Sequence, residues 1–209
     1  MNQQDVFCLL EQIGAIIKGH IVFTSGKHGS IYVNKDAIYP HINETSKLCR
    51  AIAKEFVSSD VQVVIAPVIG GIILSQWTAY HLTEITGKKV FSVYAEKTNG
   101  GFIIKRGYDK LVAGKNVLVV DDVVTTGGSV KEVVNSVRAI NGNVIGLGVL
   151  FNRGEITLQD IVNLPNSFAL VNMKLDIWSE KECPLCAQSI PINTDVGKGR
   201  EYLASKLNF

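Results

Sequence analysis

Short apolar runs alternate with amphipathic stretches through the middle of the chain. The amphipathic stretches space their apolar residues about three or four apart, which predicts helices at residues 72–85 and 130–140. The apolar runs are rich in valine and isoleucine and are predicted strands, at residues 61–66, 90–95, 116–120, 144–151 and 167–171. Strands that alternate with helices are typical of a mostly parallel sheet with helices on both faces, so the pattern predicts an α/β fold.

The segments on either side of this pattern are less regular. Before it, we expect a helix at residues 5–18, a glycine- and serine-containing stretch at 23–33, and a helix at about 43–57 that Asn43 or Thr45 caps. After it comes a tail with two prolines, a pair of cysteines and a short basic helix. The length of 209 residues is in the range of one domain.

Composition and charge exclude several classes of protein. With 21 basic and 19 acidic residues the net charge is only +2, so we expect no general attraction to nucleic acid or to a membrane surface. The longest nearly apolar run, residues 63–74, contains Pro67 and two glycines, and the start of the chain shows no signal-peptide pattern. Four cysteines are too few for a disulfide framework, which predicts a reducing, cytoplasmic location.

The most informative stretch runs from the third apolar strand into the second helix. Asp121 and Asp122 follow the apolar run, and a turn of hydroxyl residues and glycines at 125–129 opens the helix. Ligands bind at the carboxyl ends of parallel strands, and a helix N-terminus offers free N–H groups, so this turn is a candidate cradle for one phosphate. The adjacent carboxylates would repel a phosphate but accept hydrogen bonds from the vicinal hydroxyls of a ribose. The alternative is a helix N-cap formed by Asp122 or Thr126.

Residues 119–129 resemble the phosphoribosyl pyrophosphate (PRPP) motif of type I phosphoribosyltransferases. Further motifs in the same order narrow the resemblance to the orotate phosphoribosyltransferases, in the variant with a Cys-Pro-Leu-Cys tail. They are Ser25-Gly26-Lys27 with Tyr32, residues 67–71, 95–97 and 105–108, Arg153, and the tail motif at 183–186. The resemblance implies one phosphoribosyltransferase domain over residues 1–209, with a small N-terminal hood at about 1–42, a core at about 43–172 and a C-terminal tail at about 173–209.

The resemblance also implies an activity and a set of site residues. The activity is transfer of the 5-phosphoribosyl group from PRPP to orotate, giving orotidine 5′-monophosphate and pyrophosphate in pyrimidine biosynthesis, with Mg²⁺ as cofactor. The implied catalytic residues are Lys97, Asp121 and Asp122. The implied PRPP-binding residues are Lys97, Lys105, Asp121, Asp122, Val123, Val124, Thr125, Thr126, Gly127, Gly128 and Ser129. The implied orotate-binding residues are Thr125, Arg153, Lys27 and Tyr32, with the Arg153 guanidinium suited to the orotate carboxylate.

Residues 97–107 bear glycines and are basic at both ends, as a mobile flap over a polyanion requires. By resemblance the flap closes over the active site of a neighbouring subunit, which implies a homodimer with shared sites. The alternative is a solvated hairpin. The interior of the flap lacks the histidine and the extra basic residues of many family members, so the cation that faces pyrophosphate, Lys97, Lys105 or Arg106, stays open.

Two further features have alternative interpretations. The backbone amides of Ile69-Gly70-Gly71 either meet the pyrophosphate or only form a tight turn. Cys183 and Cys186 have the spacing of a zinc knuckle, but no second pair of ligands lies nearby in sequence, which favours a packed turn or a thiol pair. The four histidines show no ligand spacing and are expected to be surface or packing residues, at positions 20, 28, 41 and 81.

Two other functions remain open. The first is a phosphoribosyltransferase for another nucleobase, which a position of Arg153 far from the base would favour. The second is a PRPP-sensing regulatory protein on the same fold, which normally needs a nucleic-acid-binding element. The first sixty or so residues contain no clear helix-turn-helix pattern.

Overall fold

The computed structural model describes the whole chain except residues 2, 155–163, 165 and 208–209. Its described residues form two compact units, which we treat separately. The sheet unit comprises residues 1–6 and 39–173, and the hairpin unit comprises residues 7–38 and 174–209. Among the described residues, no helix has the length and apolar character needed to cross a bilayer.

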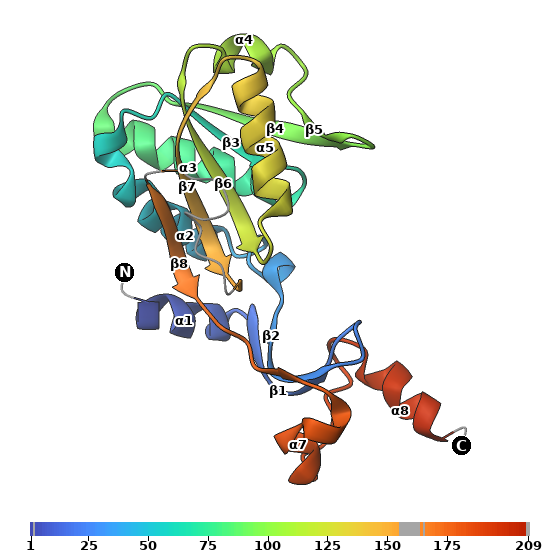
Figure 1. Cartoon of the computed structure of the whole chain (residues 1–209). Coiled ribbons are helices and arrows are strands. Elements are labelled where there is room, and N and C mark those ends of the chain that lie inside the picture. Colours follow the sequence, from blue (N-terminus) through green and yellow to red (C-terminus); the bar gives the residue numbers. More distant parts are fainter. Residues whose placement is uncertain (2, 155–163, 165, 208–209) are drawn as a thin grey trace. The chain divides into compact units, whose positions relative to one another are not determined.

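The sheet unit is built on a six-stranded sheet (Figure 1). Its strands, in spatial order, are β5 (Gly101–Ile103), β4 (Phe91–Thr98), β3 (Val63–Pro67), β6 (Asn116–Val124), β7 (Asn143–Asn152) and β8 (Ser167–Asn172). All neighbours pair in parallel except β5, which pairs antiparallel with β4 at the edge. The predicted α/β class with a mostly parallel sheet is therefore confirmed.

Helices cover both faces of this sheet. On one face lies α5 (Gly128–Ala139), which packs its four buried valines onto the valines and isoleucine of β3 and β6. On the other face lie α2 (Ile42–Glu55) and α3 (Gly70–Thr86). Two glycines of β7 permit a close approach on the α2 side, since a methyl group at Gly148 would lie 2.6 Å from the side chain of Ile52. Two short helices complete the sheet unit, η2 (Val57–Ser59) and α4 (Tyr108–Val112), and the hairpin unit contains η1 (Lys35–Ala37).

Two local predictions for the sheet unit need correction or extension, and a third is confirmed. Strand β6 continues through Asp121 and Asp122 to Val124, because β7 pairs with it along this whole length. The N-cap of α2 is His41 rather than Asn43 or Thr45, since the helix begins one residue earlier than predicted. Helix α3 ends as predicted, at a glycine in the left-handed conformation, Gly87 with φ of 68°.

The hairpin unit contains segments from both ends of the chain. Helix α1 (Gln3–Gln12) ends well before the predicted limit of residue 18, and Gly14, with φ of 71°, turns the chain. The following residues form β1 (Ile16–Val22), which pairs antiparallel with β2 (His28–Val33). The tail adds β9 (Ile177–Trp178) to the edge of β2. It then forms η3 (Glu180–Glu182), α7 (Pro184–Ala187) and α8 (Gly199–Leu207).

The two tail cysteines do have partners, contrary to the sequence-based expectation. His20 and His28 are both buried and lie against Cys183 and Cys186. The expectation failed because the histidines precede the cysteines by more than 150 residues. Cys49, on α2, is fully buried, whereas Cys8 is exposed.

Candidate active site

The turn between β6 and α5 encloses a cavity of about 210 Å³. Its lining consists of Asp121 and the consecutive residues from Val123 to Val130. The N-cap of α5 is Gly127, with φ of 76°, so the alternative that Asp122 or Thr126 caps this helix is wrong. Thr125, Thr126 and Ser129 are exposed. The cavity therefore presents three hydroxyl side chains beside the first N–H groups of a helix, a combination suited to a phosphate.

The two aspartates of β6 face different surroundings. Asp121 and Asp122 are both buried, at 7% and 4% exposure. Asp121 lines the cavity, and its Oδ1 accepts a hydrogen bond from the Asp122 N–H at 2.9 Å. Asp122 accepts one from the Val123 N–H at 2.7 Å, and its Oδ2 accepts one from the Tyr39 hydroxyl at 2.8 Å. The two carboxylates therefore have different hydrogen-bond partners, and each is held separately at the end of β6.

The turn after β3 approaches Asp122 closely. A methyl group on Gly70 would lie 2.5 Å from Asp122 Oδ2 and 2.6 Å from the Tyr39 hydroxyl oxygen, so only glycine fits without displacement. The peptide bond between Val68 and Ile69 is cis. Since β3 and β6 are parallel neighbours, this turn and the 125–129 turn lie at the same edge of the sheet.

Arg153 lies at that edge as well. Its backbone N–H donates to the Val124 carbonyl at 2.8 Å, directly beside the 125–129 turn. The next residue, Gly154, lies so close to the Thr125 carbonyl that a methyl group would collide with it. The structure therefore brings Arg153 together with both aspartates and the hydroxyl-rich turn on one sheet edge.

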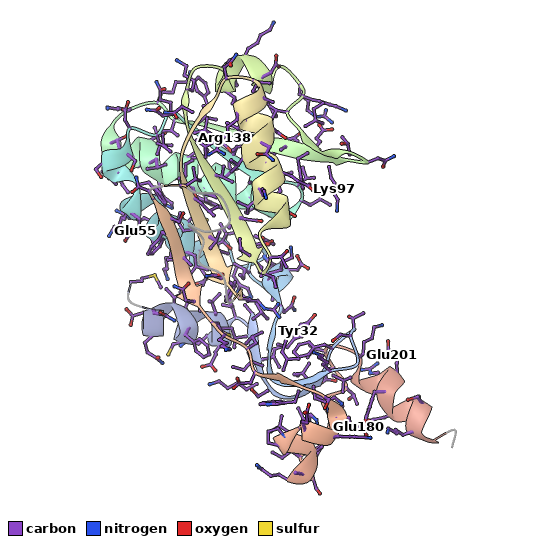
Figure 2. All side chains as sticks on the ribbon, in the orientation of Figure 1. Tyr32, Glu55, Lys97, Arg138, Glu180 and Glu201 are labelled. Carbon is purple, nitrogen blue, oxygen red and sulfur yellow. The ribbon has the colours of Figure 1, made fainter. Side chains whose placement is uncertain are left out.

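The first part of the predicted flap lies in the β4–β5 hairpin, where Lys97 pairs with Phe102, and residues 104–107 follow β5. The hairpin is tied to α5, because the Ser136 hydroxyl donates to the Phe102 carbonyl at 2.5 Å. Figure 2 shows the Lys97 side chain extending from the ribbon beside this hairpin.

The three candidate cations of the flap differ in their partners. Arg106 Nε donates to Glu96 Oε1 at 2.5 Å, and this hydrogen bond raises the pKa of Arg106 above its ordinary value. Lys97 and Lys105 are exposed and form no ion pair with any residue of the described ranges. Among the described residues, these two lysines are therefore the cations of the segment that no carboxylate neutralises.

Lys27 and Tyr32 belong to the hairpin unit. Lys27 is exposed in the turn between β1 and β2, and its backbone N–H lies 3.5 Å from Ser25 Oγ. Tyr32 is half-buried on β2, where it pairs with Ile17 of β1. Their assignment to the orotate site stays a prediction.

Tyr39 is a site residue that the sequence analysis missed. It is separated from Asp122 by 83 positions, and no motif surrounds it. A lone tyrosine before a proline gives no signal that it will hold a carboxylate, so only the fold reveals the pair.

Comparison with known proteins agrees with this geometry. Residues 36–179 match the family model of the phosphoribosyl transferase domain. A protein of Thermoanaerobacter sp. (strain X514), named orotate phosphoribosyltransferase, is 38% identical over 193 residues, which are 92% of this chain and 96% of that protein. One of Thermotoga maritima with the same name is 34% identical over 191 residues, 91% of this chain and 97% of the relative.

Solved structures show the same fold at low sequence identity. The orotate phosphoribosyltransferase of Mycobacterium tuberculosis in complex with inorganic phosphate aligns with a TM-score of 0.63 at 17% identity, over 81% of this chain and 95% of that one. The adenine phosphoribosyltransferase of Saccharomyces cerevisiae aligns with a TM-score of 0.58 at 19% identity, over 79% of this chain and 99% of that one. The same fold therefore occurs in enzymes named for orotate and for adenine, whereas the relatives that match nearly the whole chain are named for orotate. The chain belongs to the phosphoribosyltransferase family and, within it, to the orotate phosphoribosyltransferases.

Proposed function

We propose that this protein transfers the 5-phosphoribosyl group of PRPP to orotate, giving orotidine 5′-monophosphate and pyrophosphate for pyrimidine synthesis. The observation that carries the proposal is the pairing of two buried carboxylates with a hydroxyl- and amide-lined cavity at one end of β6. That pairing suits a ribose that bears a phosphate on its 5-carbon. Curated relatives that match nearly the whole chain bear the name of this activity.

Each part of the site has a distinct task in this proposal. The turn from Thr125 to Ser129 binds the 5-phosphate through its hydroxyls and the first N–H groups of α5. Asp121 and Asp122 accept hydrogen bonds from the ribose hydroxyls and stabilise the positive charge that develops at C1 as pyrophosphate leaves. Tyr39 fixes Asp122 for this task, because its hydroxyl donates a hydrogen bond to Asp122 Oδ2. Val123 and Val124 complete the wall of the cavity.

The departing pyrophosphate needs positive charge around it. Lys97 and Lys105 supply this charge, and Lys97 is the proposed catalytic cation, since Arg106 is already paired with Glu96. Mg²⁺ is the proposed cofactor, and it usually binds through one or two carboxylates together with substrate phosphates. The carboxylates of Asp121 and Asp122 fit that oxygen donor set. When bound, the ion stabilises negative charge on the pyrophosphate.

Arg153 is the proposed selector of the base. A guanidinium forms two parallel hydrogen bonds with a carboxylate, a group that orotate has and adenine, hypoxanthine and uracil lack. The position of Arg153 beside the 125–129 turn supports this assignment. Thr125 at the same turn is a further proposed orotate-binding residue, and Lys27 and Tyr32 are proposed for the same role on the resemblance alone.

A homodimer with a shared active site is part of the proposal. Helix α3 exposes large apolar side chains along one face, with Ile73 at 37% and Tyr80 at 49% exposure, and Ile69 precedes the helix at 83%. An exposed apolar face of this kind is typical of a protein–protein contact. Mixing subunits that carry Lys97→Ala with subunits that carry Asp122→Asn tests sharing, since a flap that crosses subunits restores part of the activity and a flap that acts within its own subunit restores none.

Two broader assignments complete the proposal. The chain acts as one phosphoribosyltransferase domain, which the family match over residues 36–179 supports. Its proposed location is the cytoplasm, which agrees with four cysteines that form no disulfide in the described part of the chain.

The decisive experiment mixes the protein with Mg²⁺, PRPP and orotate and follows the loss of orotate absorbance. Parallel reactions contain adenine, hypoxanthine or uracil in place of orotate. Turnover with orotate alone supports the proposal, and turnover with another base but not orotate moves the assignment to that base. Binding of PRPP without turnover of any base indicates a PRPP-sensing protein instead.

A further inference from the structure

Four metal-binding side chains meet inside the hairpin unit. They are His20 on β1, His28 on β2, Cys183 directly after η3, and Cys186 on α7. One ligand atom from each lies within 4.8 Å of every other. The histidines and Cys183 are buried, and Cys186 is half-buried. Two imidazoles and two thiols are the side-chain set of a Cys₂His₂ zinc site.

The distances within this cluster agree with a tetrahedral ion. The Sγ atoms of Cys183 and Cys186 both lie 3.6 Å from His20 Nε2, and Cys186 Sγ lies 3.4 Å from His28 Nδ1. With Zn–S bonds of about 2.3 Å and Zn–N bonds of about 2.0–2.1 Å, neighbouring S and N ligands of a tetrahedron lie roughly 3.5–3.6 Å apart. The two ring nitrogens are closer, at 2.8 Å, so binding an ion requires them to separate by about 0.5 Å.

The backbone around His20 orients its ring toward the cluster. Strand β1 has an irregular register between Lys18 and Ile21, where Gly19 has a φ of 153°. Such irregularities redirect side chains. The Nδ1 atom of His20 lies 2.8 Å from the Ile190 carbonyl, which can only accept, so Nδ1 carries the proton and donates it. The Nε2 lone pair then faces the cysteines, an arrangement that metal-binding histidines use widely.

Without an ion, the four side chains would form an unbalanced set of buried polar groups. With Nδ1 of His20 protonated, the short contact between the rings makes His28 Nδ1 the donor to His20 Nε2. The other ring nitrogen of His28, Nε2, is buried and has no hydrogen-bond partner among the described residues. In that tautomer it is a bare acceptor buried away from water, which is unfavourable. A metal on His28 Nδ1 instead moves the proton to Nε2, and the His28 ring is perpendicular to that of Tyr202, with the ring centroids 5.2 Å apart.

We propose that His20, His28, Cys183 and Cys186 bind a structural zinc ion. Two thiolates neutralise the charge of the ion, so the site is uncharged as a whole, which suits its burial. All four positions of the tetrahedron are protein ligands, and this is the mark of a structural rather than a catalytic zinc site. Soft thiolates together with imidazoles favour zinc over the hard, oxygen-binding Mg²⁺ of the proposed reaction.

The ion joins the two ends of the chain. Cys183 lies 163 residues after His20, and the backbone of the tail also pairs with β1 there, since the Asn193 N–H donates to the His20 carbonyl at 2.8 Å. The four-residue helix α7 has no buried residue, so a metal that ties it to β1 and β2 contributes directly to its folding. The proposed zinc site stands independently of the proposed reaction, because none of its ligands belongs to the candidate active site.

The metal content of the wild-type protein gives the first test. The protein is produced without a histidine tag in zinc-supplemented medium, and its metals are measured by plasma mass spectrometry after gel filtration. We expect about one zinc per chain. Cobalt reconstitution of the chelator-treated protein should give the intense visible absorption of a tetrahedral Co²⁺ site, with a thiolate charge-transfer band. No zinc in the purified protein together with no such spectrum after reconstitution would overturn the proposal without any variant.

Variants then identify the ligands. Cys183→Ser and His28→Asn should each lose most of the bound zinc, and the double variant Cys183→Ser/Cys186→Ser should lose all of it. A matched control replaces the exposed Cys8 with serine and the exposed His41 with asparagine, and we expect it to retain about one zinc per chain. Full retention of zinc in the double cysteine variant would show that these residues are not the ligands. If a variant fails to fold, the metal content of the wild-type protein still tests the proposal.

Stability gives an independent readout. A strong zinc chelator should lower the Tm of the wild-type protein, and added zinc should restore it, because an ion that binds only the folded state stabilises that state. The same chelator should leave the Tm of the double cysteine variant unchanged. An equal chelator effect on both proteins would contradict a site at these four residues.

Discussion

The close approach of Gly70 to Asp122 offers a sharp test of the active-site geometry. In Gly70→Ala, the added methyl group would lie 2.5 Å from Asp122 Oδ2 and 2.6 Å from the Tyr39 hydroxyl oxygen. Ordinary contacts begin at about 3.4 Å, so these two oxygens must retreat by roughly 0.8–0.9 Å. Gly70 is the first residue of α3 and has no positive φ, so the backbone itself accepts alanine.

The expected effect is therefore on catalysis rather than on stability. A displacement of about 1 Å in a catalytic group costs on the order of 100-fold in rate. We expect kcat/KM for PRPP to fall by about 10- to 100-fold, which corresponds to about 1.4–2.7 kcal/mol. The neighbouring Gly71→Ala provides the contrast, because its methyl group would lie 2.7 Å from Ala66 Cβ in the packed interior. Overpacking of that kind costs about 1–3 kcal/mol of stability, so its Tm should fall by more than that of Gly70→Ala.

The assay is the steady-state loss of orotate absorbance at varied PRPP concentration, with Tm measured on the same samples. Tyr39→Phe removes one of the two oxygens that the methyl group would meet. The double variant Gly70→Ala/Tyr39→Phe should therefore lose less than the sum of the two single effects. Wild-type kcat/KM in Gly70→Ala, or strict additivity in the double variant, would refute the inferred contact.

Three further outcomes follow from the same structure. Arg153→Lys should raise the KM for orotate by about 10-fold or more and change the KM for PRPP little, because lysine cannot form the paired hydrogen bonds of a guanidinium. Steady-state kinetics measures both KM values. Equal rises in the two would argue against a base-selecting role. Lys97→Ala should lower kcat by orders of magnitude. Arg106→Ala should lower it much less, because Arg106 is already paired with Glu96. The reverse order of effects would identify Arg106 as the catalytic cation. Burial raises the pKa of Cys49 from 9.0 to about 12, so the folded state keeps a proton that the unfolded state loses above pH 9.0. The free energy of unfolding should therefore fall between pH 9 and 12, by up to about 1.4 kcal/mol per pH unit, and urea titrations should show a smaller fall in Cys49→Ala.

The elements that the sequence predicted well are those with a local signal. The strands of the sheet are runs of β-branched residues, and the turn at 125–129 combines glycines with hydroxyls directly before an amphipathic helix. These patterns depend on residues that are near neighbours in sequence, so the sequence alone predicts them. Arg153 could be placed on the same edge as Asp121 because parallel strands end together.

The elements that escaped prediction depend on distant contacts. The sequence pattern predicts a helix through residue 18, but residues 16–18 pair with β2, and this pairing overrides the local preference. The pairing of Tyr39 with Asp122 spans 83 positions, and that of His20 with Cys183 spans 163. No spacing rule covers such separations, because they are set by the topology of the chain.

The hairpin unit consists of two segments that lie far apart in the sequence, so they are synthesised at different times. The ribosome completes residues 7–38 early, whereas the segment that packs with them begins only at residue 174. At about 5–20 residues per second, translation of the intervening chain takes roughly 7–27 s. Strands β1 and β2 are therefore synthesised well before β9, Cys183 and Cys186. The hairpin unit therefore cannot be completed until residues 174–209 have been translated.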